Sequence, residues 1–332
     1  MGKRSAPPTL IGGKSFTNVD WLTFTFLPDR EKDIAAEMLA FLRRYLAPEV
    51  QAITCPGLLG YENGVRFFLD IDGQACHVAR MDWGGNHYMG RARMDISGTG
   101  CSRITRWADV RQHIATQCFD LNLTRVDLAV DFLNGEYTVE QAKDWYEAGE
   151  FNAGGRMPKH SVMGAWFGNE LEPGEGRTLN IGKRGNGKML RVYEKGRQLG
   201  DPESKWTRFE VEFRNIKRDL PLDLLTECDA YFAGAYKALA NMLDTGVAAE
   251  KVATHQKEGE ISLSHLVDYA RTSYGKTIHV MRLTMTDTEI IESLAINGVP
   301  ARLEKAAVAG VLSVSPLPDQ RRTHHETDRP RF

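Results

Sequence analysis

Two segments in which apolar and polar residues alternate over most of their length constrain the fold more than any other feature of the chain. They are Leu123–Phe132 (LTRVDLAVDF) and Lys205–Arg214 (KWTRFEVEFR). Alternation with a period of two is typical of a strand that buries one face and leaves the other polar. Both segments therefore predict strands of a sheet whose apolar face covers a core and whose opposite face carries charge.

The remaining segments predict an α+β fold around these two strands. Helical spacing of apolar residues occurs in 34–46, 107–119 and 139–148. Further strand-like runs occur at 20–27, 65–70, 74–80, 87–96, 161–167, 177–182 and 189–195, several of them separated by Asp-Gly or Gly-Gly turns. Short connections favour antiparallel pairing. We predict a mainly antiparallel central sheet built from two similar β-rich halves with flanking helices, plus a helical C-terminal region.

The domain organisation follows from the same patterns. We predict a flexible N-terminal arm over 1–18 and an α+β domain over 19–216, whose halves are about 19–135 and 136–216. A mostly helical region covers 217–312, in which Thr286 and Glu289 form a capping box at the start of one helix. The polar, Pro-bearing segment 313–332 is predicted to be a disordered tail.

Composition excludes several classes of protein. The 332 residues carry a net charge of −2, so the chain as a whole gives no sign of a polyanionic partner. Its five cysteines lie far apart without a C-x-x-C pair and indicate reduced thiols in a cytoplasmic protein. No apolar run approaches the roughly 18 residues of a membrane span, so we expect no membrane partner.

Four carboxylates lie on the polar faces of the two alternating strands. They are Asp127 and Asp131 in the first strand and Glu210 and Glu212 in the second. Like charges two residues apart repel each other, and a divalent cation that prefers oxygen ligands relieves that repulsion. If the strands are neighbours, the four acids form a candidate site for Mg²⁺ or Mn²⁺. The alternative is four ordinary solvent-facing acids.

A basic segment precedes the second strand. Residues 177–197 hold seven cations against one acid, Glu194. The cations are Arg177, Lys183, Arg184, Lys188, Arg191, Lys195 and Arg197. Closely spaced cations replace the counterions of a phosphate backbone, so this segment, with Arg208 and Arg214 of the second strand, is a candidate nucleic-acid-binding surface. The alternative is a solvated hairpin.

Tyr193 lies within the basic segment. In a regular strand it shares a face with Met189, Arg191 and Lys195. A phenol with a pKa near 10 is a weak nucleophile, and nearby cations or a metal would favour the phenolate. A tyrosine in a strand is more often a packing residue, so its neighbourhood alone makes Tyr193 a candidate nucleophile.

Three segments together resemble a known family. They are Thr124–Phe132, Gly176–Gly196 and Trp206–Asn215, and their order and spacing resemble the replication initiation factors of rolling-circle plasmids and filamentous phages. The later segment 286–305 also resembles the phage members.

The resemblance implies an origin-specific endonuclease that nicks one DNA strand, stays joined to the 5′ phosphate through a tyrosine, and later rejoins the strand. By motif, Tyr193 would be the nucleophile, and Arg191 and Lys195 would contact phosphate. The same match assigns Mg²⁺ or Mn²⁺ to Asp127, Glu210 and Glu212, with Asp131 as an alternate ligand. None of the nine histidines forms an H-x-H pair, so an all-carboxylate site is required.

The partners implied by the family are origin DNA, single-stranded or extruded as a hairpin, and the host helicase and DNA polymerase. A homodimer is possible on the same basis. Two other interpretations of the residues stay open. One is a metal-dependent nuclease that uses water instead of tyrosine, and the other is a non-catalytic nucleic-acid-binding regulator.

Overall fold

The computed structural model describes residues 16–29, 33–85, 88–152, 155–166, 176–243, 249–253 and 263–296. The chain divides into two compact units, Met1–His255 and Gln256–Phe332. Most of the predicted N-terminal arm and the whole predicted tail lie outside the described residues.

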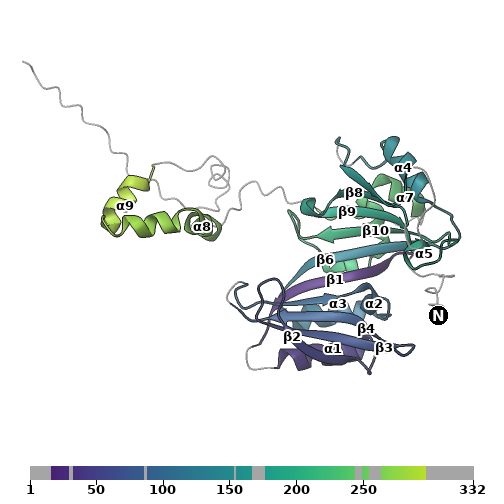
Figure 1. Cartoon of the computed structure of the whole chain (residues 1–332), viewed down its shortest axis with the longest axis horizontal. Helices are drawn as coiled ribbons and strands as arrows, with labels where there is room; N and C mark the ends of the chain where they lie inside the picture. Colours follow the sequence, from purple (N-terminus) through teal and green to yellow (C-terminus); the bar gives the residue numbers. More distant parts are fainter. Residues whose placement is uncertain are drawn as a thin grey trace, which may run out of the picture. The chain divides into compact units, whose positions relative to one another are not determined.

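A single antiparallel sheet forms the first unit (Figure 1). Its strands are β1 (Asn18–Leu27), β2 (Gln51–Pro56), β3 (Asn63–Ile71), β4 (Gln74–Trp83), β5 (Ala92–Ile96), β6 (Phe119–Phe132), β7 (His160–Met163), β8 (Thr178–Lys183), β9 (Lys188–Glu194) and β10 (Thr207–Arg214). Among the described residues the spatial order is β2-β3-β4-β5-β1-β6-β10-β9-β8-β7. The predicted α+β class with a mainly antiparallel sheet is confirmed.

The sheet consists of two copies of one topology. The first copy runs β1, α1 (Ile34–Tyr45), β2, β3, β4, β5, and the second runs β6, α4 (Val139–Glu147), β7, β8, β9, β10. In each copy the first strand returns beside the last one, and the two first strands, β1 and β6, pair with each other. The two similar halves predicted from the sequence are therefore present, but by topology the second half begins with β6 and not at about residue 136.

Helices cover the apolar face of the sheet. Alternation buries Phe24 of β1, Val126 and Leu128 of β6, and Phe209 and Val211 of β10 in one core. Into the same core pack α1, α3 (Trp107–Gln117), α4, the 3₁₀ turn Leu222–Leu225, α6 (Cys228–Ala235) and α7 (Lys237–Leu243). The helices after β10 thus share the core of the sheet unit.

Local signals set where the helices begin. The Asp33 side chain accepts hydrogen bonds from the first backbone N–H groups of α1, and Thr138 forms a capping box with Gln141 at the start of α4. These caps satisfy donors that have no partner within the helix.

The structure differs from the sequence prediction at two places on the first half. Strand β2 was not predicted, because it is an edge strand whose side chains are largely exposed and show no alternation of burial. Strand β5 is shorter than the predicted run 87–96, because Met89 and Gly90 adopt positive φ in a turn before it. The short helix α2 (Gly98–Cys101) follows β5.

The second unit contains α8 (Leu263–Met281) and α9 (Asp287–Leu294). The predicted capping box is confirmed: Thr286 and Glu289 exchange side-chain to backbone hydrogen bonds at the start of α9. No helix in the described part of the chain is both long and apolar enough to cross a membrane.

Candidate nucleic-acid groove

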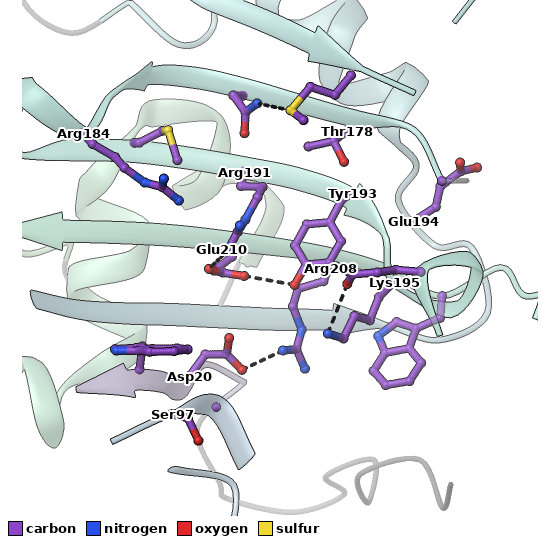
Figure 2. A pocket seen from close by; sticks show the side chains of 18 of the residues that line it. Asp20, Ser97, Thr178, Arg184, Arg191, Tyr193, Glu194, Lys195, Arg208 and Glu210 are labelled. Carbon is purple, nitrogen blue, oxygen red and sulfur yellow. Dashed lines mark hydrogen bonds and ion pairs between the residues drawn. The ribbon is translucent and has the colours of Figure 1, made fainter. Parts of the chain in front are cut away.

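The polar face of the sheet is hollowed into a groove of about 1380 Å³. Strands of both topological copies line it, with α2 at one rim and α5 (Lys195–Gln198) at another. Figure 2 shows the centre of this groove, where Tyr193, Arg208 and Glu210 lie together.

Strand register brings the predicted site residues together. Strands β6 and β10 are neighbours, with Glu212 opposite Asp127 and Arg208 opposite Asp131. On the other side of β10, strand β9 places Tyr193 opposite Arg208. The condition that the two alternating strands be adjacent is therefore met, and the charged face is continuous across three strands.

Tyr193 is held as a hydrogen-bond donor at the centre of the groove. Its hydroxyl donates to Glu210 Oε2 at 3.0 Å, and the side chains of Arg191 and Lys195 lie 5.3 and 5.6 Å from its ring centroid. Burial, followed by the charge of Glu210, raises the pKa of Tyr193, and Arg208 and Arg191 only partly oppose this. The cations therefore favour the phenolate as expected from the sequence, but burial outweighs them and the net direction favours the phenol.

Glu210 connects this phenol to a cation. The Glu210 side chain is 2% exposed, and its Oε1 accepts a hydrogen bond from Arg191. One carboxylate oxygen therefore faces the tyrosine hydroxyl and the other faces a guanidinium. This arrangement suits a carboxylate that accepts a proton while its charge partner stays in place.

Asp127 and Glu212 are buried among arginines. Arg125 Nε donates to Asp127 Oδ1 at 2.9 Å, and Arg184 Nε donates to Glu212 Oε2 at 2.9 Å, with Arg214 bound to the other oxygen of Glu212. Burial raises the pKa of Asp127 to about 8 although Arg125 opposes it. For Glu212 burial is opposed by the surrounding arginines, which hold its pKa below the ordinary value.

Arg208 joins the two copies of the topology. It binds both oxygens of Asp131 at 2.7 Å and Asp20 Oδ1 at 2.6 Å (Figure 2 shows the Asp20 contact), and its side chain is 12% exposed. The Trp206 indole N–H also donates to Asp131 at 2.6 Å. Burial raises the pKa of Asp20, and Arg208 opposes the rise.

The predicted metal ligands are adjacent but occupied by cationic side chains. Among the described residues, no group of three or more His, Cys, Asp or Glu side chains is placed to hold a metal ion. Carboxylate oxygens are the right donors for Mg²⁺ or Mn²⁺, yet Asp127, Glu210 and Glu212 each bind an arginine already. The residues as arranged do not fit the ion, because it would have to displace an arginine first, and the metal site stays a prediction.

Several predicted DNA-binding cations line the groove. They are Lys183, Arg184, Arg191, Lys195 and Arg208. Lys183 is the last residue of β8 and is exposed, with no ion pair to another described residue. Burial and Arg208 lower the pKa of Lys195.

Lys188 lies on the opposite face of the sheet. Its Nζ donates to the carbonyl of Ala235 in α6 and lies 4.0 Å from the ring centroid of Tyr236. Burial, with Arg218 and Lys251 nearby, lowers the pKa of Lys188 to about 8. Lys188 is therefore not part of the groove.

Three other predicted DNA-binding cations do not line the groove, and each of them pairs with a carboxylate. Arg177 and Arg197 both pair with Glu194 at the end of β9, and Arg177 also binds Glu140 of α4. Arg214 forms an ion pair with Glu212, as described above. A role of these three in binding nucleic acid stays a prediction.

Fold and site together define an α+β protein with a cation-lined groove around a buried tyrosine–glutamate pair. The sequence model of the replication initiation factor family matches residues 121–294, which is more than half of the chain. The chain belongs to the replication initiation factor family, as the sequence resemblance predicted.

The chain is also similar to a solved structure. It is the rolling circle replication initiator protein from Geobacillus stearothermophilus, with 21% identity and a TM-score of 0.48, and the match covers 76% of this chain and 95% of that one. No curated protein matches the chain.

Proposed function

We propose that this chain initiates rolling-circle replication by nicking one DNA strand at an origin, with Tyr193 as the nucleophile. The observation that carries the proposal is the hydrogen bond from the Tyr193 hydroxyl to Glu210, inside a groove lined by cations. Membership of the family supports origin DNA as the substrate.

The chemical step starts from the phenol that the structure favours. Tyr193 Oη attacks the phosphorus and forms the new P–O bond, and its proton passes to Glu210 at the 3.0 Å hydrogen bond. The bond from phosphorus to the 3′ oxygen breaks, and that oxygen takes a proton from Lys195, whose lowered pKa makes the ammonium a better acid. The products are a 5′-phosphotyrosyl bond and a free 3′ hydroxyl.

The proton transfer to Glu210 also changes the pairing of Arg191. When Glu210 takes the proton it becomes neutral, so Arg191 loses its anionic partner. The guanidinium is then available to the negative charge that develops on the phosphoryl oxygens. Rejoining is the reverse: a 3′ hydroxyl gives its proton to Lys195 and attacks the phosphorus, the bond from phosphorus to Tyr193 Oη breaks, and Glu210 returns the proton to Tyr193.

Metal dependence stays in the proposal only on the condition that an arginine first releases its carboxylate: Asp127, Glu210 and Glu212, with Asp131 as the alternate, would then hold Mg²⁺ or Mn²⁺, which would supply Lewis-acid polarisation of a phosphate. From the family resemblance we further propose the host helicase and DNA polymerase as partners, a homodimer, and residence on either a plasmid or a filamentous phage.

The test is an adduct assay. Labelled single-stranded oligonucleotides that tile the replicon encoding the chain are incubated with the protein and Mg²⁺ or Mn²⁺, with a chelator as the parallel arm. We expect a denaturation-resistant protein–DNA adduct that Tyr193→Phe abolishes and that Tyr231→Phe, on α6, leaves unchanged. Cleavage without an adduct would select a water-using nuclease, and binding without cleavage under any condition would select a regulator.

A further inference from the structure

Two tryptophans in the groove are not used by the proposed chemistry. Trp21 of β1 and Trp206, which directly precedes β10, both line the groove and are half-buried. A half-buried indole in a strongly charged groove leaves apolar ring surface in contact with water, which costs free energy unless a ligand covers it.

Both rings are fixed by carboxylates at their polar edges. The Trp206 N–H donates to Asp131 at 2.6 Å, and the Trp21 N–H donates to Asp95 at 2.7 Å. A guanidinium packs over the Trp21 ring as well, since Arg125 lies 4.5 Å from its centroid. Rings held in one orientation lose little entropy when a flat group stacks on them.

The positions of the two rings relative to Tyr193 follow from strand register. Arg208, which is opposite Tyr193, is two residues after Trp206, or roughly 7 Å along the strand. In the other direction along β10, Glu212 is four residues after Arg208, or roughly 14 Å along the strand. Trp21 is level with Glu212, because both are paired with Asp127 of β6. The Tyr193 hydroxyl reaches over β10 to Glu210 and so lies between the two tryptophans along the strand direction.

We propose that Trp206 and the Trp21–Arg125 pair each stack one unpaired nucleobase, on opposite sides of the phosphate at Tyr193. The inference rests on the proposed function and adds the form of the substrate: a single strand whose bases are splayed across the sheet. Aromatic rings and arginine planes are the groups on which proteins stack unpaired bases, and every base has a ring face to offer. Duplex DNA keeps its bases stacked on each other and cannot use these platforms.

The experiment removes one base at a time. The Tyr193→Phe protein, which cannot form the tyrosyl adduct, is titrated with the oligonucleotide of the tiling pool that it binds most tightly, carrying a single abasic site at each successive position. We expect two separate positions at which the abasic site weakens binding by about 5- to 150-fold. Trp206→Leu should abolish the effect at one position only, and Trp21→Leu at the other only.

Controls separate stacking from structure. Trp107→Leu, on α3 and packed against the core, should leave both abasic effects in place. Trp206→Phe keeps a ring but loses the bond to Asp131, so it should retain most of the effect that Trp206→Leu removes. Circular dichroism and thermal melting show whether each variant is folded. Where Trp206→Leu is not folded, the abasic scan of the Tyr193→Phe protein alone still tests the inference.

Several results would overturn the inference. These are an abasic scan with no sensitive position, loss of both positions in either single variant, or equal affinity for the duplex form of the oligonucleotide. The abasic scan measures binding only, so its result does not depend on whether the protein forms the covalent adduct. A wild-type adduct with a flat scan refutes the stacking alone, and two sensitive positions without an adduct refute the tyrosine chemistry alone.

Discussion

Glu210→Gln tests the proton transfer at the centre of the site with little change of shape. The amide keeps the size of the carboxylate and an oxygen that can accept from the Tyr193 hydroxyl, but it cannot take the proton. Arg191 loses its charge partner, and because its side chain is 31% exposed it can turn to solvent. The fold should therefore survive, and the loss should fall on the chemical step.

The size of the loss follows from the state of Tyr193. Burial, the larger cause of its raised pKa, remains in the variant, so we expect fewer than about one molecule in a thousand to hold a phenolate at pH 7. General acid–base catalysis contributes roughly 10²- to 10⁴-fold, or about 2.7 to 5.5 kcal/mol of barrier. We expect adduct formation by Glu210→Gln to be slower by a factor in that range.

The assay is single-turnover adduct formation between pH 6 and pH 9 at saturating oligonucleotide. Without a base in the protein, the rate of Glu210→Gln should rise about tenfold per pH unit, because only the ionised fraction of Tyr193 reacts. Glu140→Gln, an exposed position on α4, is the matched control and should behave as wild type. A Glu210→Gln rate within threefold of wild type at pH 7, or a pH profile parallel to wild type, would refute the role of Glu210.

Three further predictions concern binding and stability. Lys183→Ala should reduce the slope of log affinity for single-stranded DNA against log salt concentration by about 0.7. Lys188→Ala, on the opposite face of the sheet, should leave that slope unchanged. Fluorescence anisotropy measures the affinity of both variants, and equal effects would contradict the placement of Lys188. Arg208→Met should lower the free energy of unfolding in urea by about 3 kcal/mol, because it strips two carboxylates of their partner, and a change below 1 kcal/mol would argue against the junction described here. Burial raises the pKa of Glu194, but hydrogen bonds from Arg177 outweigh it and the net pKa is lowered, so the stability that Glu194 contributes to the fold is complete above the ordinary value of 4.5 and is lost as the pH falls through the lower folded value. Glu194→Gln should therefore weaken the dependence of unfolding on pH below pH 4.5, as followed by circular dichroism. An unchanged dependence would contradict the pairing of Glu194 with Arg177.

Local patterns predicted much of the fold. Alternation identified β6 and β10 and their polar faces, and a capping box identified the start of α9. Those signals are carried by residues near in sequence. Strand β2 was missed because an exposed edge strand has no buried face to impose alternation.

The site was predictable in its residue types but not in its contacts. Asp20 was missed because its partner Arg208 is 188 positions away in the sequence, and no local sequence pattern around Asp20 indicates that contact. The sequence could have predicted that Lys188 lies on the core face of the sheet, because Lys188 alternates in phase with the apolar residues Leu190 and Val192 of the same strand. The high pKa of Tyr193 depends on burial, which only the assembled sheet sets.

The junction between β1 and β6 has a consequence for the order in which the chain matures. Its pairs join residues about a hundred positions apart, such as Leu22 and Val126, and contacts of this kind form late in folding. During synthesis from the N-terminus, Tyr193 leaves the ribosome before Arg208 and Glu210 do. A nascent chain that stops short of β10 therefore lacks both the proposed proton acceptor, Glu210, and the cation that joins β10 to β1, Arg208. The nicking activity proposed above would then begin only when the last strand of the sheet is in place.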